Sequence, residues 1–228
     1  MAQFYAPNLQ ITDTSYFLTE EESKHCIRVL RMQVDDSLEL INGKGLLFQV
    51  IIIEAHPKKC SVKILSVVQM PAPKKEIHIA IAPTKNMDRM EWFVEKAGEI
   101  GLTKLSLIKC HNSERKVCNL ERMQKIAIAA MKQSKQYYLP EIEELISFNT
   151  FLAKYPKGMI AHCYQEEKTE IATATQTGPL LIGPEGDFSK EELALALKSG
   201  YLPVSLGENR LRTETAALLG VFHLSIRS

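Results

Sequence analysis

The sequence predicts an α/β protein in which a small β-rich domain precedes a larger domain built on a parallel sheet. Residues 1–70 contain several short apolar strands and one amphipathic helix. Residues 71–75 contain two prolines and show no periodicity, which is typical of a linker between domains. Residues 76–228 alternate short apolar strands with helices, and this alternation indicates a parallel sheet. The expected domains are therefore residues 1–70 and 76–228.

The first seventy residues predict a small β-barrel that carries one helix. Thr19 and Glu22 form a capping-box pattern at the start of this helix. Strands are expected at Ser37–Ile41, Leu46–Ile53 and Cys60–Val68, and an Asn-Gly-Lys-Gly turn joins the first two as a hairpin. Several short strands with one helix in a segment of this length are typical of a small barrel.

The chain beyond the linker predicts strands and helices in alternation. A helix that begins at Asp88 and ends at Gly101 lies between two apolar strands, which forms a βαβ unit. The other expected elements follow the same rules of apolar period and terminal residues: strands at Ile77–Ala82, Leu105–Ile108 and Met159–Cys163, and helices at Asn119–Tyr137 and Phe148–Tyr155.

A short loop rich in glycine follows the next apolar strand, Leu180–Ile182. The loop is Gly183-Pro184-Glu185-Gly186, in which the two glycines allow positive φ and close approach of a ligand to the backbone. Ser189 and Glu192 then form a capping-box pattern for a helix that stops at Gly200.

A second unit of strand, loop and helix completes the chain. The strand Leu202–Leu206 leads into the loop 207–212, and Thr213 is expected to cap a last helix rich in Ala and Leu. The two loops should lie at one edge of the sheet, where open α/β sheets bind their ligands.

Composition and motifs exclude several classes of protein. The 28 basic and 27 acidic residues leave a net charge of +1, so a nucleic-acid partner would have to meet a local patch. The five cysteines include no C-x-x-C pair, and neither disulfides nor a metal site is expected. No leader peptide and no apolar run near ~20 residues is present, so no membrane span is expected and the expected compartment is the cytoplasm.

The common nucleotide-binding fingerprints are missing as well. No G-x-G-x-x-G follows a strand and no G-x-x-x-x-G-K-[ST] occurs, which removes the main support for a dinucleotide dehydrogenase or a P-loop NTPase. A ligand held by the backbone of the loops remains. Adenine can pair with main-chain N–H and C=O groups where glycines such as Gly183, Gly186 and Gly207 leave room.

Two segments, IGPEGDFSKEE and LGENRLRTETAAL, resemble the SPOUT class of S-adenosylmethionine-dependent RNA methyltransferases. Within it they are similar to the ribosomal small-subunit methyltransferase E family, which methylates N3 of a uridine in 16S rRNA. HCIRVLRMQVDDSLELINGKG resembles the start of that family. The chain departs from the family's usual pattern at Asp187, where a glycine is usual, and at Asn209-Arg210, where an Arg-Ile pair is usual.

The resemblance implies both an architecture and partners. It implies a PUA-like RNA-binding barrel, followed by a SPOUT α/β domain with a parallel sheet and a C-terminal trefoil knot, which is a rare exception to the rule against threaded chains. It also implies S-adenosylmethionine as cofactor, 16S rRNA in the small ribosomal subunit as substrate, and a homodimer.

The site residues are expected in the two loops that carry the resemblance. The guanidinium of Arg212 is the first candidate to stabilise charge on the uracil, Arg210 is the second, and Glu214 could orient Arg212 or simply pair with it. The expected cofactor-binding residues are Leu181, Ile182, Gly183, Pro184, Glu185, Gly186, Leu206, Gly207, Leu211, Arg212 and Thr213.

Two groups of basic residues are candidates for RNA binding. Three of them follow an i, i+4, i+7 spacing on the first helix, for which a solvated helix face is an equally good interpretation. The others lie in the segment 85–138, which has eleven basic and six acidic residues and matches the family's pattern. The candidates are Lys24, Arg28, Arg31, Arg115, Lys132 and Lys135.

Two other functions stay open at this point. One is a 2′-O-ribose RNA methyltransferase of the same fold class, and the other is an RNA-binding ribosome assembly factor that does not catalyse. Histidines give no further guidance: His25, His111 and His162 lack the spacing of metal ligands, and each is expected in the core or on the surface.

Overall fold

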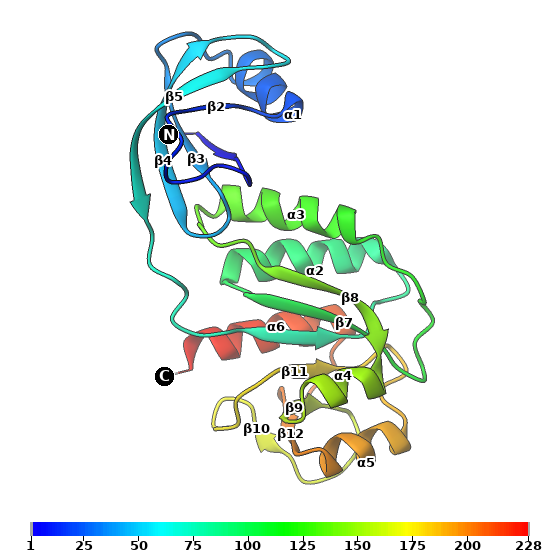
Figure 1. Ribbon diagram of the computed structural model, residues 1–228. Helices are drawn as coiled ribbons and strands as arrows, with labels where there is room; N and C mark the ends of the chain where they lie inside the picture. The colour runs from blue at the N-terminus through cyan, green and yellow to red at the C-terminus, as the bar shows by residue number, and fades with distance from the viewer. Residues whose placement is uncertain (1, 228) are drawn as a thin grey trace. The chain divides into compact units, whose positions relative to one another are not determined.

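The computed structural model describes residues 2–227 and divides into two compact units (Figure 1). One unit comprises the chain up to Lys74 together with Met131–Leu139, and the other comprises Lys75–Ala130 together with the chain from Pro140 onward. Within residues 2–227, the helices are too short or too polar to cross a bilayer.

The first unit is built on a five-stranded sheet in the order β1-β3-β4-β5-β2. Buried side chains such as Leu38, Leu40, Phe48 and Val50 alternate along the strands and form its core. The three expected strands are confirmed with ends shifted by at most one residue, whereas β1 and β2 are too short to show a period. The strands are β1 (Gln3–Tyr5), β2 (Ser15–Phe17), β3 (Ser37–Ile41), β4 (Leu46–Glu54) and β5 (Ser61–Gln69).

The helix of the first unit begins where the sequence predicts, but only half of its capping box forms. The Thr19 hydroxyl accepts a hydrogen bond from the Glu22 backbone N–H at 3.3 Å. The Glu22 carboxylate instead accepts hydrogen bonds from the Tyr5 backbone N–H at 3.1 Å and from Lys132 Nζ at 2.6 Å. Glu22 therefore ties the helix to β1 and to the segment 131–139 of the same unit.

The helix then changes its winding. α1 (Glu20–Lys24) passes into a π-helical turn, η1 (His25–Val29), and Arg31 beyond it has a left-handed φ of 55°. The expected α-helical spacing of Lys24, Arg28 and Arg31 is therefore wrong, because a wider turn shifts the direction of the later side chains. Sequence periodicity assumes a uniform helix and cannot detect such a turn.

The second unit holds a seven-stranded sheet in the order β10-β12-β9-β11-β6-β7-β8, in which every paired strand is parallel (Figure 1). The expected parallel sheet is confirmed, and β8 and β10 are additions that were not expected. The strands are β6 (His78–Ile81), β7 (Lys104–Lys109), β8 (Glu141–Ser147), β9 (Gly158–Ala161), β10 (Thr169–Glu170), β11 (Leu180–Ile182) and β12 (Tyr201–Ser205).

Helices cover both faces of this sheet because its central strands are apolar on both sides. Leu181 belongs to a core cluster with residues of α4 and α5, whereas Leu180 meets Gly220 of α6. The capping box of Ser189 and Glu192 is confirmed at the start of α5, with backbone-to-side-chain bonds of 3.2 and 2.9 Å. The helices are α2 (Met87–Ile100), α3 (Leu120–Gln133), α4 (Phe148–Lys154), α5 (Lys190–Lys198) and α6 (Thr213–Ile226).

A buried carboxylate explains how the charged strand β8 is accommodated. Glu143 is mostly buried, and its Oε1 accepts hydrogen bonds from Lys154 Nζ at 2.8 Å and Tyr155 Oη at 2.9 Å. Lys104 Nζ lies 3.0 Å from the same oxygen, and the Ser106 hydroxyl donates to Oε2. The paired lysines offset the cost of burying this charge.

We expect Glu143→Gln to lower stability at neutral pH and to matter less in acid. Burial alone would raise the pKa of Glu143, but hydrogen bonds from Lys154, Ser106, Lys104 and Tyr155 outweigh it and lower the pKa from 4.5 to about 2. The ionised Glu143 therefore makes its full contribution to the free energy of unfolding above about pH 4.5, and this contribution is lost as the pH falls through about 2.

Urea unfolding of wild type and variant at pH 7, 4.5 and 3 measures this difference. Glu141→Gln is the matched control, because the Glu141 carboxylate is 63% exposed in its ion pair with Lys104 and should contribute little. A difference between wild type and Glu143→Gln that is the same at pH 3 and pH 7 would contradict the expectation.

Candidate functional site

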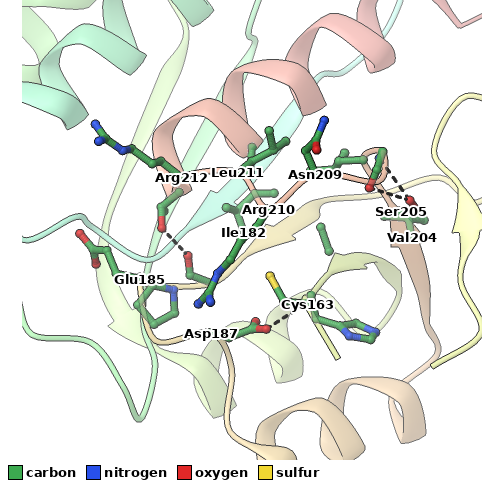
Figure 2. Close-up of a pocket in the computed structure, with 18 of the residues that line it drawn as sticks. Cys163, Ile182, Glu185, Asp187, Val204, Ser205, Asn209, Arg210, Leu211 and Arg212 are labelled. Carbon is green, nitrogen blue, oxygen red and sulfur yellow. Dashed lines mark hydrogen bonds between the residues drawn. The ribbon is translucent and has the colours of Figure 1, made fainter. Parts of the chain in front are cut away.

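A pocket of about 350 Å³ lies where three parallel strands of the second unit end (Figure 2). Its walls come from the segments that follow β9, β11 and β12 and from the start of α6. Carboxyl ends of neighbouring parallel strands meet at one edge of a sheet, which is the usual ligand site of open α/β folds. The volume is in the range of small-molecule sites.

Most residues predicted to bind a cofactor line this pocket. Leu181 and Gly186 are not among its lining residues. Neighbouring residues of a strand point to opposite faces, so Leu181 is fully buried in the core while Ile182 lines the pocket. The Gly186 carbonyl accepts a hydrogen bond from Asn112 at 3.1 Å. The predicted residues in the lining are Ile182, Gly183, Pro184, Glu185, Leu206, Gly207, Leu211, Arg212 and Thr213.

The first loop is a tight turn closed by an aspartate. The positive φ expected at Gly183 and Gly186 is wrong, because the left-handed position is Asp187, with φ 65°. Aspartate tolerates this conformation better than most residues. Its backbone N–H donates to Pro184 O at 2.9 Å, and its carboxylate accepts hydrogen bonds from the backbone N–H groups of Cys163 at 2.7 Å and Phe188 at 2.8 Å.

Gly183 is required for a different reason. A Cβ at this position would lie 3.1 Å from the ring of Phe188, which is fully buried. A larger residue would push against the core below the loop. Glycine therefore serves here for close packing.

The second loop is joined to the first by one hydrogen bond. Gly207 has a φ of 118°, and its N–H donates to Ser205 Oγ at 3.1 Å. The expected cap of α6 is wrong by one residue: Arg212 is the N-cap and forms no side-chain cap bond. Thr213 is already helical, and its hydroxyl donates to Gly183 O at 3.2 Å across the two loops.

The two candidate arginines both line the pocket and point in different directions (Figure 2). Arg210 extends toward Asp187, and the Arg212 guanidinium points to another side. Both side chains are exposed. Of the two, Arg210 therefore faces the aspartate that joins two of the pocket segments.

Glu214 is buried behind the pocket. It is 6% exposed, and its Oε1 lies 3.7 Å from Arg89 Nε on α2. The predicted contact between Glu214 and Arg212 is therefore wrong, because the side chain leaves the first turn of α6 toward α2. Sequence spacing places the two residues close together but does not show in which direction each side chain points.

Nine residues of the lining were not predicted, and four of these have ionisable side chains: His162, Cys163, Lys168 and Asp187. Three of these four follow β9, a strand that was predicted but that ends at Ala161, two residues earlier than expected. One rule could have found them: β9 pairs in parallel with β11, so the residues after both strands lie at the same edge of the sheet. Strand order, however, is a tertiary property that the local pattern of β9 does not contain.

The predicted RNA-binding residues are distributed over the two units. Lys24, Arg28, Arg31 and Lys135 are exposed, and Lys24 pairs with Glu20 at 2.7 Å. Lys132 is engaged by Glu22, as described above. Arg115 donates to Lys85 O from Nη2 at 2.6 Å, so part of its guanidinium holds a backbone segment. Within residues 2–227 no cluster of three His, Cys, Asp or Glu is placed to hold a metal ion.

Two family models match the chain. The RNA methyltransferase domain matches residues 71–224, and the RNA methyltransferase PUA domain matches residues 18–65. The Ribosomal RNA small subunit methyltransferase E of Rickettsia conorii is 29% identical over 212 residues, which cover 90% of this chain and 86% of that protein.

Solved structures agree with this assignment. The crystal structure of a probable rRNA-methyltransferase from Porphyromonas gingivalis is 40% identical, with a TM-score of 0.90 and coverage of 97% of this chain and 95% of that one. A putative methyltransferase from Legionella pneumophila, solved with bound SAM, is 30% identical, with a TM-score of 0.85 and coverage of 96% and 94%. The chain therefore belongs to the RNA methyltransferase family, in the ribosomal RNA small subunit methyltransferase E group that its two loop motifs predict.

Proposed function

We propose that the protein transfers a methyl group from S-adenosylmethionine to N3 of a uridine in 16S rRNA of the small ribosomal subunit. The observation that carries the proposal is the pocket where β9, β11 and β12 end, in a chain of the RNA methyltransferase family. The Legionella relative is solved with SAM, and the Rickettsia relative is named for the small ribosomal subunit.

The pocket fits this cofactor. Its volume suits a small molecule, and we assign the pairing with adenine to backbone N–H and C=O groups of the two loops that line it. The carboxylates of Glu185 and Asp187 line it, and both would favour a positively charged sulfonium. When bound, the cofactor supplies an electrophilic methyl group.

The protein side chains then have to handle the target base. Uracil N3 lies on the pairing edge, so the base must be unpaired or swung out of the stack. As N3 loses its proton, negative charge spreads to O2 and O4. A fixed guanidinium can stabilise this charge, and Arg212 is our first candidate with Arg210 as the second. Glu214, buried against Arg89, would hold the first turn of α6 and thereby the position of Arg212.

The position of the transferred methyl group tests the proposal. Purified protein, labelled S-adenosylmethionine and small subunits from a strain that lacks the gene are combined, and the rRNA is digested and analysed by mass spectrometry. We expect the label on uridine N3. Label on a ribose oxygen would replace the proposal by the 2′-O reading, and a protein that neither binds the cofactor nor transfers label would be an assembly factor.

We assign separate tasks to the parts of the chain. Residues 1–70 would bind RNA and residues 76–228 would carry out the transfer, with residues 71–75 as linker. The family ranges 18–65 and 71–224 support this division. The basic residues predicted for RNA would contact the phosphate backbone and leave the choice of target to RNA shape. An rRNA substrate would place the protein in the cytoplasm.

We also propose a homodimer formed through α2 and α6, which pack against each other. Trp92 on α2 is 42% exposed, and Phe222 and Ile226 on α6 are 46% and 61% exposed. Large apolar side chains exposed on adjacent helices are typical of a surface that another protein covers. A second copy of the chain would cover the same surface on both partners.

Phe222→Glu should convert the dimer to a monomer at micromolar concentration, because a buried and unpaired carboxylate opposes association. Light scattering across a concentration series measures the mass. Leu195→Glu is the control, since Leu195 is 38% exposed on the separate helix α5. A wild-type mass that corresponds to the monomer at all concentrations would refute the dimer.

A further inference from the structure

One buried side chain in the pocket wall has no partner within the protein. His162 directly follows β9, lines the pocket and is 7% exposed. Neither of its ring nitrogens has a hydrogen-bond partner among residues 2–227. A buried polar group without a partner lowers stability, so such a group in a native protein calls for a partner. Its place in the pocket suggests that a ligand provides one.

The backbone around His162 is fixed independently of its ring. Lys168 Nζ donates to His162 O at 3.0 Å and to Tyr164 O at 2.9 Å. The next residue, Cys163, is held by the carboxylate of Asp187 at 2.7 Å. The ring of Tyr164 lies beside the imidazole, with centroids 5.9 Å apart. The imidazole is therefore positioned by its surroundings, while its hydrogen-bonding atoms stay unused.

The protonation state of the His162 imidazole limits which chemical groups can form hydrogen bonds with it. Burial and the nearby Lys168 ammonium lower the pKa of His162, while Asp187 and Glu166 act in the opposite direction. A neutral imidazole has one donor nitrogen and one acceptor nitrogen. A hydroxyl group matches either nitrogen, because it can donate or accept, whereas a carboxylate matches only the donor.

We propose that His162 binds a ribose hydroxyl of the cofactor. The proposal rests on the proposed function, since it takes the pocket to hold S-adenosylmethionine. Adenine carries its hydrogen-bond donors and acceptors on separate atoms. The separate N–H and C=O groups of the backbone in the 206–213 loop are therefore its natural partners. The ribose hydroxyls combine both properties in one atom, and the wall that contains His162 provides a matching side chain on a rigid segment.

The test is a thermodynamic cycle between this side chain and the ligand hydroxyls. Calorimetry gives the Kd of S-adenosylhomocysteine and of its 2′-deoxy and 3′-deoxy analogues for wild type, His162→Phe and His162→Asn. We expect His162→Phe to weaken binding of the parent ligand about tenfold. It should have no further effect with the analogue that lacks the contacted hydroxyl, and His162→Asn should recover part of the loss. The control is His56→Phe, an exposed histidine of the first unit, which should bind all ligands as wild type does.

The outcomes separate this inference from the proposed function. Wild type that binds none of the ligands would overturn the function and the inference with it. Two results would overturn the inference alone, provided that wild type binds the ligands. In the first, His162→Phe binds as tightly as wild type; in the second, it loses the same factor in affinity for all three ligands. If His162→Phe does not fold, wild type with ¹⁵N-labelled histidine keeps the inference testable. The His162 ring signals should shift with the parent ligand and less with one deoxy analogue, and unchanged signals would refute it.

Discussion

Arg212→Ala is expected to lower kcat by about 10²–10³-fold and to leave stability close to wild type. A preorganised cation that stabilises charge in the transition state contributes little to ground-state binding, so its loss should affect turnover. The fold should tolerate the change, because the Arg212 side chain is exposed and forms no cap bond with α6.

Turnover of labelled cofactor at saturating RNA measures this effect, and thermal unfolding shows that the variant is folded. Arg212→Lys should recover only part of the activity, since an ammonium lacks the planar fork of a guanidinium. The control is Lys198→Ala, which removes an exposed cation at the end of α5. If Arg212→Ala has a normal kcat and Arg210→Ala shows the large fall in kcat instead, the catalytic role belongs to Arg210.

Phe188→Ala is expected to lower the free energy of unfolding by about 3–5 kcal/mol. Phe188 is fully buried, packs at 5.6 Å from the ring of Phe148, and supports Gly183 in the first loop. Its carbonyl also accepts a hydrogen bond from Tyr164 Oη at 2.8 Å. Removing the ring leaves a cavity directly below the loop, so cofactor affinity should fall together with stability.

Urea unfolding and calorimetry with S-adenosylhomocysteine measure the two effects on the same sample. Leu197→Ala is the control in the same unit, because Leu197 is 37% exposed and its truncation should cost less than about 1 kcal/mol. A Phe188→Ala variant as stable as the control would show that the loop does not depend on the core beneath it.

Local patterns predicted the elements that build the pocket. The apolar run of β11, the capping box of α5 and the strand β12 are properties of a few neighbouring residues, and each formed within one residue of its expected position. The meeting of the two loops followed from a general rule on parallel sheets. These parts of the site therefore needed no knowledge of distant contacts.

The parts that were missed depend on contacts between distant segments. β8 carries three glutamates, which is unusual for a strand. Glu143 is tolerated there because it forms ion pairs with Lys104 and Lys154, which belong to other elements. His162 looked like an ordinary histidine because its place beside β11 is set by strand order. The left-handed residue of the first loop was assigned to a glycine, since composition does not show that the bonds of Asp187 stabilise it.

The position of β11 in the sheet bears on how the protein is made. This strand pairs with β6 on one side and with β9 on the other, although β7 and β8 are synthesised between those two neighbours. A nascent chain that ends before Leu180 therefore leaves an apolar strand edge on both β6 and β9, and such edges promote aggregation. Contacts this far apart in sequence also slow folding. During translation the second unit would thus stay vulnerable until Leu180–Ile182 emerge, and a chaperone that shields strand edges would raise the yield of full-length protein.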